Sequence, residues 1–321
     1  MVEFDFFNHR LCRWSATGEL WEAVIFEVSR PVRLVITRRA TQRLLLLRPS
    51  QEINQVFLYC LALAAERFSV RVHAYCALSN HFHLVATDPE GKLPKFMRWL
   101  DGTLARCLNS YHARWENFWA SGTYSRVELA GDADVLSKMV YTITNPVASG
   151  LVARSEEWPG ARSGTLRNGS ETITVKRPGF FFRKTGPLPE EASLVVVRPR
   201  AFPELSEEAF GTLLHNTVTG REEMLREDLR AAGKRFLGSM RVLKQAPLDR
   251  PGSREPRRGM NPRVAARDKW RRIERLQWLD SWLAAYAEAL RRFTAGFREA
   301  VFPAGTYWMR VHHRVRCYAP P

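Results

Sequence analysis

Between residues 31 and 144 the apolar residues follow two spacings, one typical of strands and one typical of helices. Short apolar or alternating runs predict four strands, at 31–38, 70–78, 81–87 and 124–130. Spacings of three and four predict helices over about 51–68 and 92–114 and a third from Asp132 or Asp134 to about Thr144, where Asn145-Pro146 should end it. The order β-α-β-β-α-β-α predicts an α+β fold with one antiparallel sheet and helices on one face, the ferredoxin-like arrangement.

Beyond residue 160 the pattern becomes mainly helical. Turn-rich pieces and short strands such as 193–198 fill 156–200, and helices are predicted over 206–229 and from about Asn261, with Pro262 in the first turn. In the last helix, apolar residues at alternating spacings of four and three form a short heptad seam, for which packing within the chain is favoured over dimerisation: Leu279, Leu283, Tyr286, Leu290, Phe293 and Phe297. We therefore divide the chain into an N-terminal extension (1–30), an α+β domain (31–160) and a C-terminal domain (161–321).

The net charge of +16 is concentrated in the second half of the chain, because residues 1–150 carry +3 and residues 151–321 carry +13. Such a surface suits a polyanion, since neutralising the phosphates of a nucleic acid releases condensed counterions. The C-terminal domain is thus expected to bind DNA or to act as an accessory.

Cysteine usage and hydropathy exclude several other classes of protein. Five scattered cysteines without a CxxC pair are typical of reduced thiols in a cytosolic protein and argue against structural zinc. The longest apolar run, 57–65, is far shorter than the roughly 20 residues of a membrane span, so no membrane partner is expected.

Two histidines, His81 and His83, stand one residue apart in an apolar strand. Side chains at i and i+2 of a strand share a face, while Phe82 and Leu84 point the other way into the core. Two neutral imidazoles make half of a divalent-metal site, although such a pair can also be merely structural. His73 on the neighbouring strand is either a third ligand or, as we favour, a hydrogen-bonding neighbour.

Tyr141 and Asn145 are four residues apart near the end of the third predicted helix and hence lie on one face. Against the histidine face, this helix would supply a phenol nucleophile and a neutral oxygen ligand. A set of His81, His83 and Asn145 with open positions suits Mg²⁺ or Mn²⁺ at a phosphate better than a closed tetrahedral zinc site. The alternative is a helix end where Tyr141 packs and Asn145 makes a turn.

These two stretches together resemble a known family. His81-Phe82-His83 is similar to the His-hydrophobic-His motif of HUH single-strand nucleases, and "VYTITNPVASGLV" (140–152) resembles the tyrosine helix of single-tyrosine transposases, especially the REP-associated tyrosine transposases. The resemblance covers about Pro31 to Pro159. It implies that His81, His83 and Asn145 bind the metal ion and that Tyr141 is the nucleophile.

The resemblance also implies an activity. It indicates an HUH nuclease core that acts as a metal-dependent single-stranded DNA endonuclease and strand transferase beside hairpins. The reaction would pass through a covalent 5′-phosphotyrosine and would need no ATP. The resemblance also implies a prokaryotic protein of the cytoplasm that acts at the nucleoid. Whether the protein is a monomer or a homodimer is left open. Two other classes also stay open: a small-molecule metallohydrolase, although no HxHxDH pattern follows, and a non-catalytic nucleic-acid-binding protein on the same fold.

Overall fold

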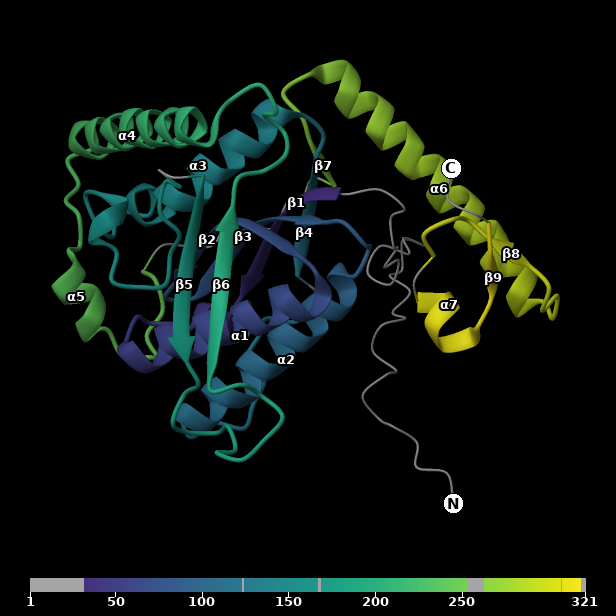
Figure 1. The fold of residues 1–321 in the computed structure, drawn as a ribbon, viewed down its shortest axis with the longest axis horizontal. Coiled ribbons are helices and arrows are strands. Elements are labelled where there is room, and N and C mark those ends of the chain that lie inside the picture. Colours follow the sequence, from purple (N-terminus) through teal and green to yellow (C-terminus); the bar gives the residue numbers. More distant parts are fainter. Residues whose placement is uncertain (1–31, 123, 167–168, 253–262, 307, 319–321) are drawn as a thin grey trace.

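A seven-stranded sheet forms the centre of the molecule (Figure 1). The computed structural model describes residues 32–122, 124–166, 169–252, 263–306 and 308–318, so the predicted extension 1–30 lies outside the described residues. The strands of this sheet are β1 (Val32–Arg39), β2 (Arg71–Leu78), β3 (His81–Asp88), β4 (Ser125–Leu129), β5 (Ser170–Lys176), β6 (Glu191–Val197) and β7 (Val264–Ala265). They lie in the order β5-β6-β2-β3-β1-β4-β7.

The sheet is mostly antiparallel, which confirms the predicted α+β class. β3 pairs antiparallel with β1 and β2, β1 with β4, and β5 with β6, whereas β6 joins β2 and β7 joins β4 in parallel. The four predicted strands of the first half are all present, within two residues of their predicted ends. The sheet also continues beyond residue 160, because β5 and β6 extend it past β2, and β7 extends it past β4.

The helices are α1 (Gln51–Phe68), α2 (Leu93–Tyr111), α3 (Asp132–Ala148), α4 (Glu207–Ala231), α5 (Ser239–Lys244), α6 (Lys269–Thr294) and α7 (Trp308–His313), with short 3-10 helices η1 (Thr41–Arg43) and η2 (Ser155–Glu157). The predicted bounds of α1 are confirmed. The Ser50 hydroxyl caps its start by accepting the Ile53 N–H at 3.1 Å, and Ser69 ends it in the left-handed conformation. Across the described residues no helix is long and apolar enough to cross a membrane.

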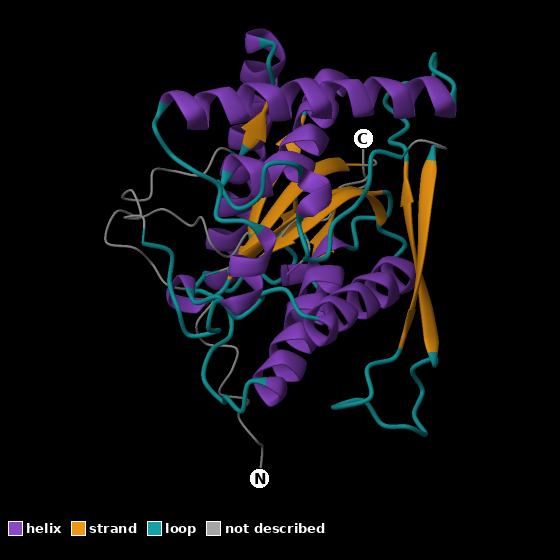
Figure 2. Ribbon diagram, turned by 90° about the vertical axis from the view of Figure 1, so that its left-hand side faces the viewer, coloured by secondary structure: helices purple, strands orange, loops and turns teal. Residues whose placement is uncertain are grey.

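Helices cover both faces of the sheet, which differs from the expectation of helices on one face. The α1 ring of Phe57 packs against Phe82 and Tyr75, at centroid distances of 5.5 and 6.2 Å, so α1 covers the face opposite the histidines. α3 lies on the histidine face, where Tyr141 meets His83. The physical reason is the burial of β3, in which seven of eight residues are buried, so that both of its faces need cover. Figure 2 shows the central strands enclosed by helices.

The prediction that Asn145-Pro146 ends the third helix is wrong, because α3 continues to Ala148. The chain leaves the helix at Gly150, whose φ of +68° is favourable for glycine. The Gly150 N–H donates to the Val147 carbonyl and the Leu151 N–H to the Pro146 carbonyl, both at 2.9 Å, which is a Schellman ending. Pro146 removes one hydrogen bond from the helix, and the buried residues around it keep the helix in place.

The last long helix begins later than the sequence predicts. Val264 and Ala265 form strand β7, and α6 starts at Lys269 with the Asp268 carboxylate accepting the N–H groups of Trp270 and Arg271. Asn261 and Pro262 lie outside the described residues.

The heptad seam of α6 packs within the chain, which is the alternative that the sequence analysis favoured over dimerisation. Its rings meet a small unit of β8 (Val301–Phe302), α7 and β9 (Arg316–Cys317), which lies beside the far end of α6 in Figure 1. Trp282 and Tyr286 stack at 5.4 Å, and Phe302 and Phe293 complete this core. Phe297 follows the end of the helix and is 55% exposed, so it does not belong to the seam.

Candidate active site

The rings of His81 and His83 converge at the start of β3. Their Nε2 atoms are 3.1 Å apart, and the rings stand nearly perpendicular, at 87°. Strand geometry puts both side chains on one face, as the spacing predicts, and α3 covers that face.

Each outer ring nitrogen has a partner of its own. His81 Nδ1 lies 2.6 Å from Asn80 Oδ1, and His83 Nδ1 lies 2.8 Å from the hydroxyl of Thr37, its cross-strand partner on β1. An amide oxygen only accepts, so His81 donates from Nδ1 and its Nε2 carries a lone pair. The Thr37 hydroxyl can donate or accept, so His83 is able to use either tautomer.

Both imidazoles are held neutral. Burial lowers the pKa of His81 to about 4, helped by the positive charges of Arg39 and Arg43. Burial also lowers the pKa of His83 well below its ordinary value, with smaller contributions from His81 and from the Lys138 ammonium. Neutral imidazole is the form that binds metal ions, so both rings stay competent as ligands in mildly acidic solution.

Tyr141 reaches the histidines from α3. Its ring meets the His83 ring edge to face, with centroids 5.3 Å apart, and the side chain remains 43% exposed. The ammonium of Lys138, one turn earlier, lies 5.3 Å from the centre of the Tyr141 ring. The phenol is thus open to a large substrate and lies beside a cation that can bind an anionic group.

Asn145 lies one helical turn beyond Tyr141 on α3, about 6 Å along the helix axis. The helix begins near β1, where Asp132 pairs with Arg33, and it meets β3 where the Tyr141 ring contacts the His83 ring. The Asn145 side chain is buried, and its Oδ1 accepts the Ser149 hydroxyl at 3.3 Å.

His73 is a hydrogen-bonding neighbour rather than a third ligand. One ring nitrogen lies 2.7 Å from the Val197 carbonyl oxygen and the other 2.8 Å from the Thr87 hydroxyl, so both are occupied. Thr87 lies four residues along β3 from His83, roughly 13 Å away.

The residues present fit a hard divalent cation. At metal–nitrogen bonds of roughly 2.1 Å, two ligands at right angles lie about 3 Å apart, and the two Nε2 atoms are 3.1 Å apart. Across the described ranges no group of three or more His, Cys, Asp or Glu side chains lies in position to bind a metal ion. The third ligand expected from the sequence is Asn145, a neutral oxygen donor.

Three contributors were not identified from the sequence: Thr37, Asn80 and Lys138. Thr37 becomes a partner of His83 only through the β1–β3 register, which the sequence does not reveal. Asn80 and Lys138 carried a local signal, since Asn80 precedes His81 and Lys138 lies three residues before Tyr141.

Comparisons with known proteins find a family match for part of the chain. The family model described as transposase IS200 like matches residues 35–134, less than a third of the chain. The matched segment contains His81 and His83 and ends before Tyr141, and this match confirms the resemblance drawn from the sequence motifs. None of the curated proteins matches.

Two solved structures are similar to the chain. One is of a REP-associated tyrosine transposase bound to a REP hairpin, with 18% identity over 43% of this chain and 77% of that chain and a TM-score of 0.35. The other is described as a transposase from Deinococcus radiodurans R1, with 18% identity over 30% of this chain and 78% of that chain and a TM-score of 0.26.

Proposed function

We propose that this chain, whose residues 35–134 match the family model described as transposase IS200 like, is a metal-dependent HUH nuclease that cleaves and rejoins single-stranded DNA beside hairpins through Tyr141. The observation that carries the proposal is the contact between the Tyr141 ring and the His83 ring, 5.3 Å apart. It puts the one exposed phenol of α3 next to two neutral imidazoles whose Nε2 atoms converge. A nucleophile beside a half-built metal site is the arrangement that phosphodiester cleavage requires.

His81 and His83 would hold Mg²⁺ or Mn²⁺, with Asn145 as the third ligand. When bound, such an ion polarises the scissile phosphate and offsets the negative charge that develops during attack. Asn80 fixes the orientation of the His81 ring, and Thr37 that of the His83 ring. For Asn145 to act, its Oδ1 has to exchange the Ser149 hydroxyl for the ion.

The chemical step conserves the number of phosphodiester bonds. The Tyr141 oxygen attacks phosphorus, the bond to the 3′ oxygen breaks, and the proton lost by the phenol is balanced by the proton gained at the released 3′-hydroxyl. The product is a 5′-phosphotyrosine. Attack by another 3′-hydroxyl reverses the step and joins new strands, so no ATP is needed. Lys138 would contact the phosphate oxygens.

The basic region after residue 160 would contribute contacts to DNA rather than chemistry. Asp134, seven residues before Tyr141 on α3, accepts the N–H of Arg267 at 2.8 Å and so ties the segment that precedes α6 to the helix of the nucleophile. The first turn of α6 carries Arg271 and Arg272, both exposed, beside Trp270, which is 75% exposed. Cations interleaved with an exposed indole suit an unpaired strand. We assign the catalytic role to 31–160, the DNA-binding or accessory role to 161–321, and the nucleoid as the place of action.

The proposal is tested by trapping the covalent intermediate. The full chain with Mn²⁺ and a pool of hairpin-bearing single strands should yield a protein–DNA species that resists denaturation and maps to the peptide containing Tyr141. Tyr141→Phe should abolish this species while leaving DNA binding intact, because only the hydroxyl is lost. The matched control is Tyr111→Phe, a phenol of similar exposure on α2, which should behave as wild type. An adduct that persists in Tyr141→Phe would refute the assignment.

A further inference from the structure

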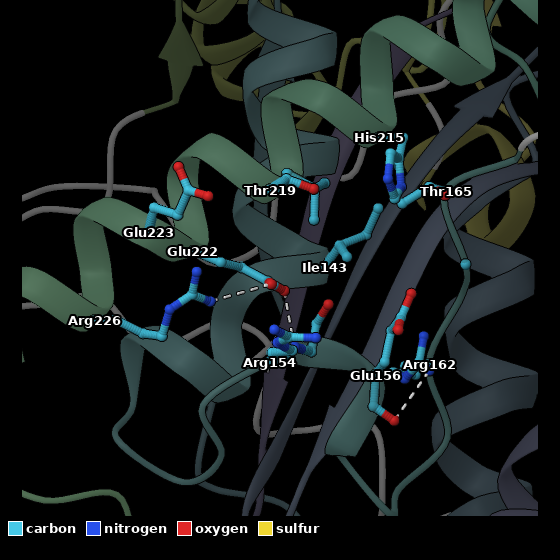
Figure 3. Close-up of a pocket in the computed structure, with 13 residues that line it drawn as sticks. Ile143, Arg154, Glu156, Arg162, Thr165, His215, Thr219, Glu222, Glu223 and Arg226 are labelled. Carbon is cyan, nitrogen blue, oxygen red and sulfur yellow. Dashed lines mark hydrogen bonds and ion pairs between the residues drawn. The ribbon is translucent and has the colours of Figure 1, made fainter.

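A cavity of about 280 Å³ lies between α3, α4, η2 and the segment 162–165 (Figure 3). It is separate from the site of Tyr141: Ile143 lines it, and a helix turns about 200° over two residues, so the cavity lies on nearly the opposite side of α3. The transposase-like chemistry makes no use of it.

The cavity is polar, and its lining carries three guanidinium groups and three carboxylates, those of Glu156, Glu222 and Glu223. Arg154, Arg162 and Arg226 line it, from three different segments. The side chain of Arg154 is exposed, and Arg162 makes long hydrogen bonds, at 3.3 and 3.4 Å, to the carbonyl oxygens of Glu156 and Ser163. The planar donor forks of Arg154 and Arg162 can therefore turn to a bound anion at little cost.

One carboxylate is built into the wall rather than offered to a ligand. Glu222, 7% exposed, accepts the Ser155 N–H at 2.8 Å and lies 3.7 Å from Arg226, which itself donates to the Ala153 carbonyl at 3.2 Å. These bonds tie α4 to η2 and fix the shape of the cavity. In Figure 3 Glu156 and His215 lie across from this group.

The mixture of groups defines the class of ligand. Guanidinium forks bind phosphate, while Glu156, His215 and Thr219 offer acceptors and donors for the polar edge of a base. A volume near the lower end of small-molecule pockets is suited to one nucleotide rather than a larger cofactor. We propose that this cavity is a second site that binds a single nucleotide, with its phosphate on Arg154 and Arg162 and its base towards Glu156 and His215.

The nucleotide could come from two sources, a free mononucleotide or one unpaired nucleotide of a strand, and the test separates them. Calorimetry in EDTA with the full-length Tyr141→Phe chain should show dGMP binding more tightly than inorganic phosphate. Arg154→Gln and Arg162→Gln should each weaken dGMP binding about tenfold or more, because each removes a charge-assisted contact. Arg221→Gln, the same charge change on exposed α4 surface outside the lining, should leave it unchanged.

A second arm uses a single-stranded 12-mer. If dGMP reduces the binding of the 12-mer to the wild-type chain but not to the Arg154→Gln variant, the site takes a nucleotide of the strand. If the 12-mer is unaffected, the site takes the free nucleotide. Because Arg154 is exposed and no hydrogen bond of Glu222 or Ser155 depends on it, its replacement should leave the unfolding transition in place. Phosphate binding as tightly as dGMP, or equal losses in Arg221→Gln, would overturn the proposal. Neither measurement requires strand cleavage, so the nucleotide-site proposal can fail or succeed independently of the proposed function.

Discussion

His81 Nε2 lies 3.1 Å from His83 Nε2, and the outer nitrogen of each ring is held by a different residue. Since Asn80 keeps the His81 proton on Nδ1, His83 has to supply the proton between the two Nε2 atoms when no cation is bound. The Thr37 hydroxyl then donates to His83 Nδ1. A cation requires the other tautomer of His83, in which Thr37 accepts. Cation binding is thereby coupled to the rotation of one hydroxyl on β1.

Replacing His81 and His83 with Ala should remove divalent-ion binding and lower strand cleavage by at least about 100-fold, because both convergent nitrogens are lost. Calorimetry with Mn²⁺ and a cleavage assay measure the two effects. The fold should persist, since Phe82, Leu84 and Val85 keep the strand buried. Cleavage at the wild-type rate in EDTA would contradict the metal assignment.

Thr37→Val should weaken Mn²⁺ binding by roughly 10- to 100-fold, because the His83 ring loses the partner that orients it. Valine keeps the branched shape that suits a strand. The matched control is Thr87→Val, which removes the hydroxyl partner of His73 on the same sheet. Equal Mn²⁺ affinities in the two variants would rule out the positioning role of Thr37.

Lys138→Met should slow adduct formation by roughly 10- to 100-fold, the value of one charge-assisted hydrogen bond to the phosphate. It should also raise the pKa of His83 towards its ordinary value, because the Lys138 charge helps to lower it. Lys95→Met, an exposed lysine on α2, is the control with the same charge change. Single-turnover cleavage and NMR titration of the imidazoles measure these effects. An unchanged rate would exclude Lys138 from the reaction.

Replacing Arg267, Arg271 and Arg272 with Gln should weaken single-stranded DNA binding and reduce the slope of log affinity against log salt by about 2, if each contacts one phosphate. Arg221, Arg230 and Lys234, exposed on and beyond α4, give a control triple with the same charge change. Fluorescence anisotropy over a range of salt concentrations measures the slope. The same loss in both triples would show that net charge, rather than the start of α6, governs binding.

The buried His73 should make folding stability depend on pH. Burial lowers its pKa to about 4 from an unfolded value of 6.5, so between those values the unfolded chain binds more protons than the folded one. Stability therefore falls as pH falls through this window, by up to about 3 kcal/mol from this residue. Urea unfolding at pH 7.5 and 4.5 measures it. His73→Gln should show a smaller drop than wild type, and an equal drop would assign the effect to other groups.

Much of this architecture is local and could be predicted. The bounds of α1 follow from Ser50 as N-cap and from the spacing of its apolar residues. Tyr141 and His83 could be expected on facing elements because helix and strand periodicity each fix a face. The end of α3 could not be predicted, because Pro146 and Gly150 are both residues that end helices and tertiary packing decides between them. The pairing of β2 with β6 could not be predicted either, because it joins Val72 to Val196 across more than a hundred residues of sequence.

The outer neighbours of β2 and β4 in the sheet are β6 and β7, strands that follow the transposase-like segment in the chain. A reading frame interrupted soon after α3 would leave the outer edges of β2 and β4 unpaired, and bare strand edges associate with other chains. Nonsense mutations in the second half of the gene would therefore yield aggregated or degraded protein, not a free-standing nuclease released from its basic region. Loss of the C-terminal half would act as a null allele.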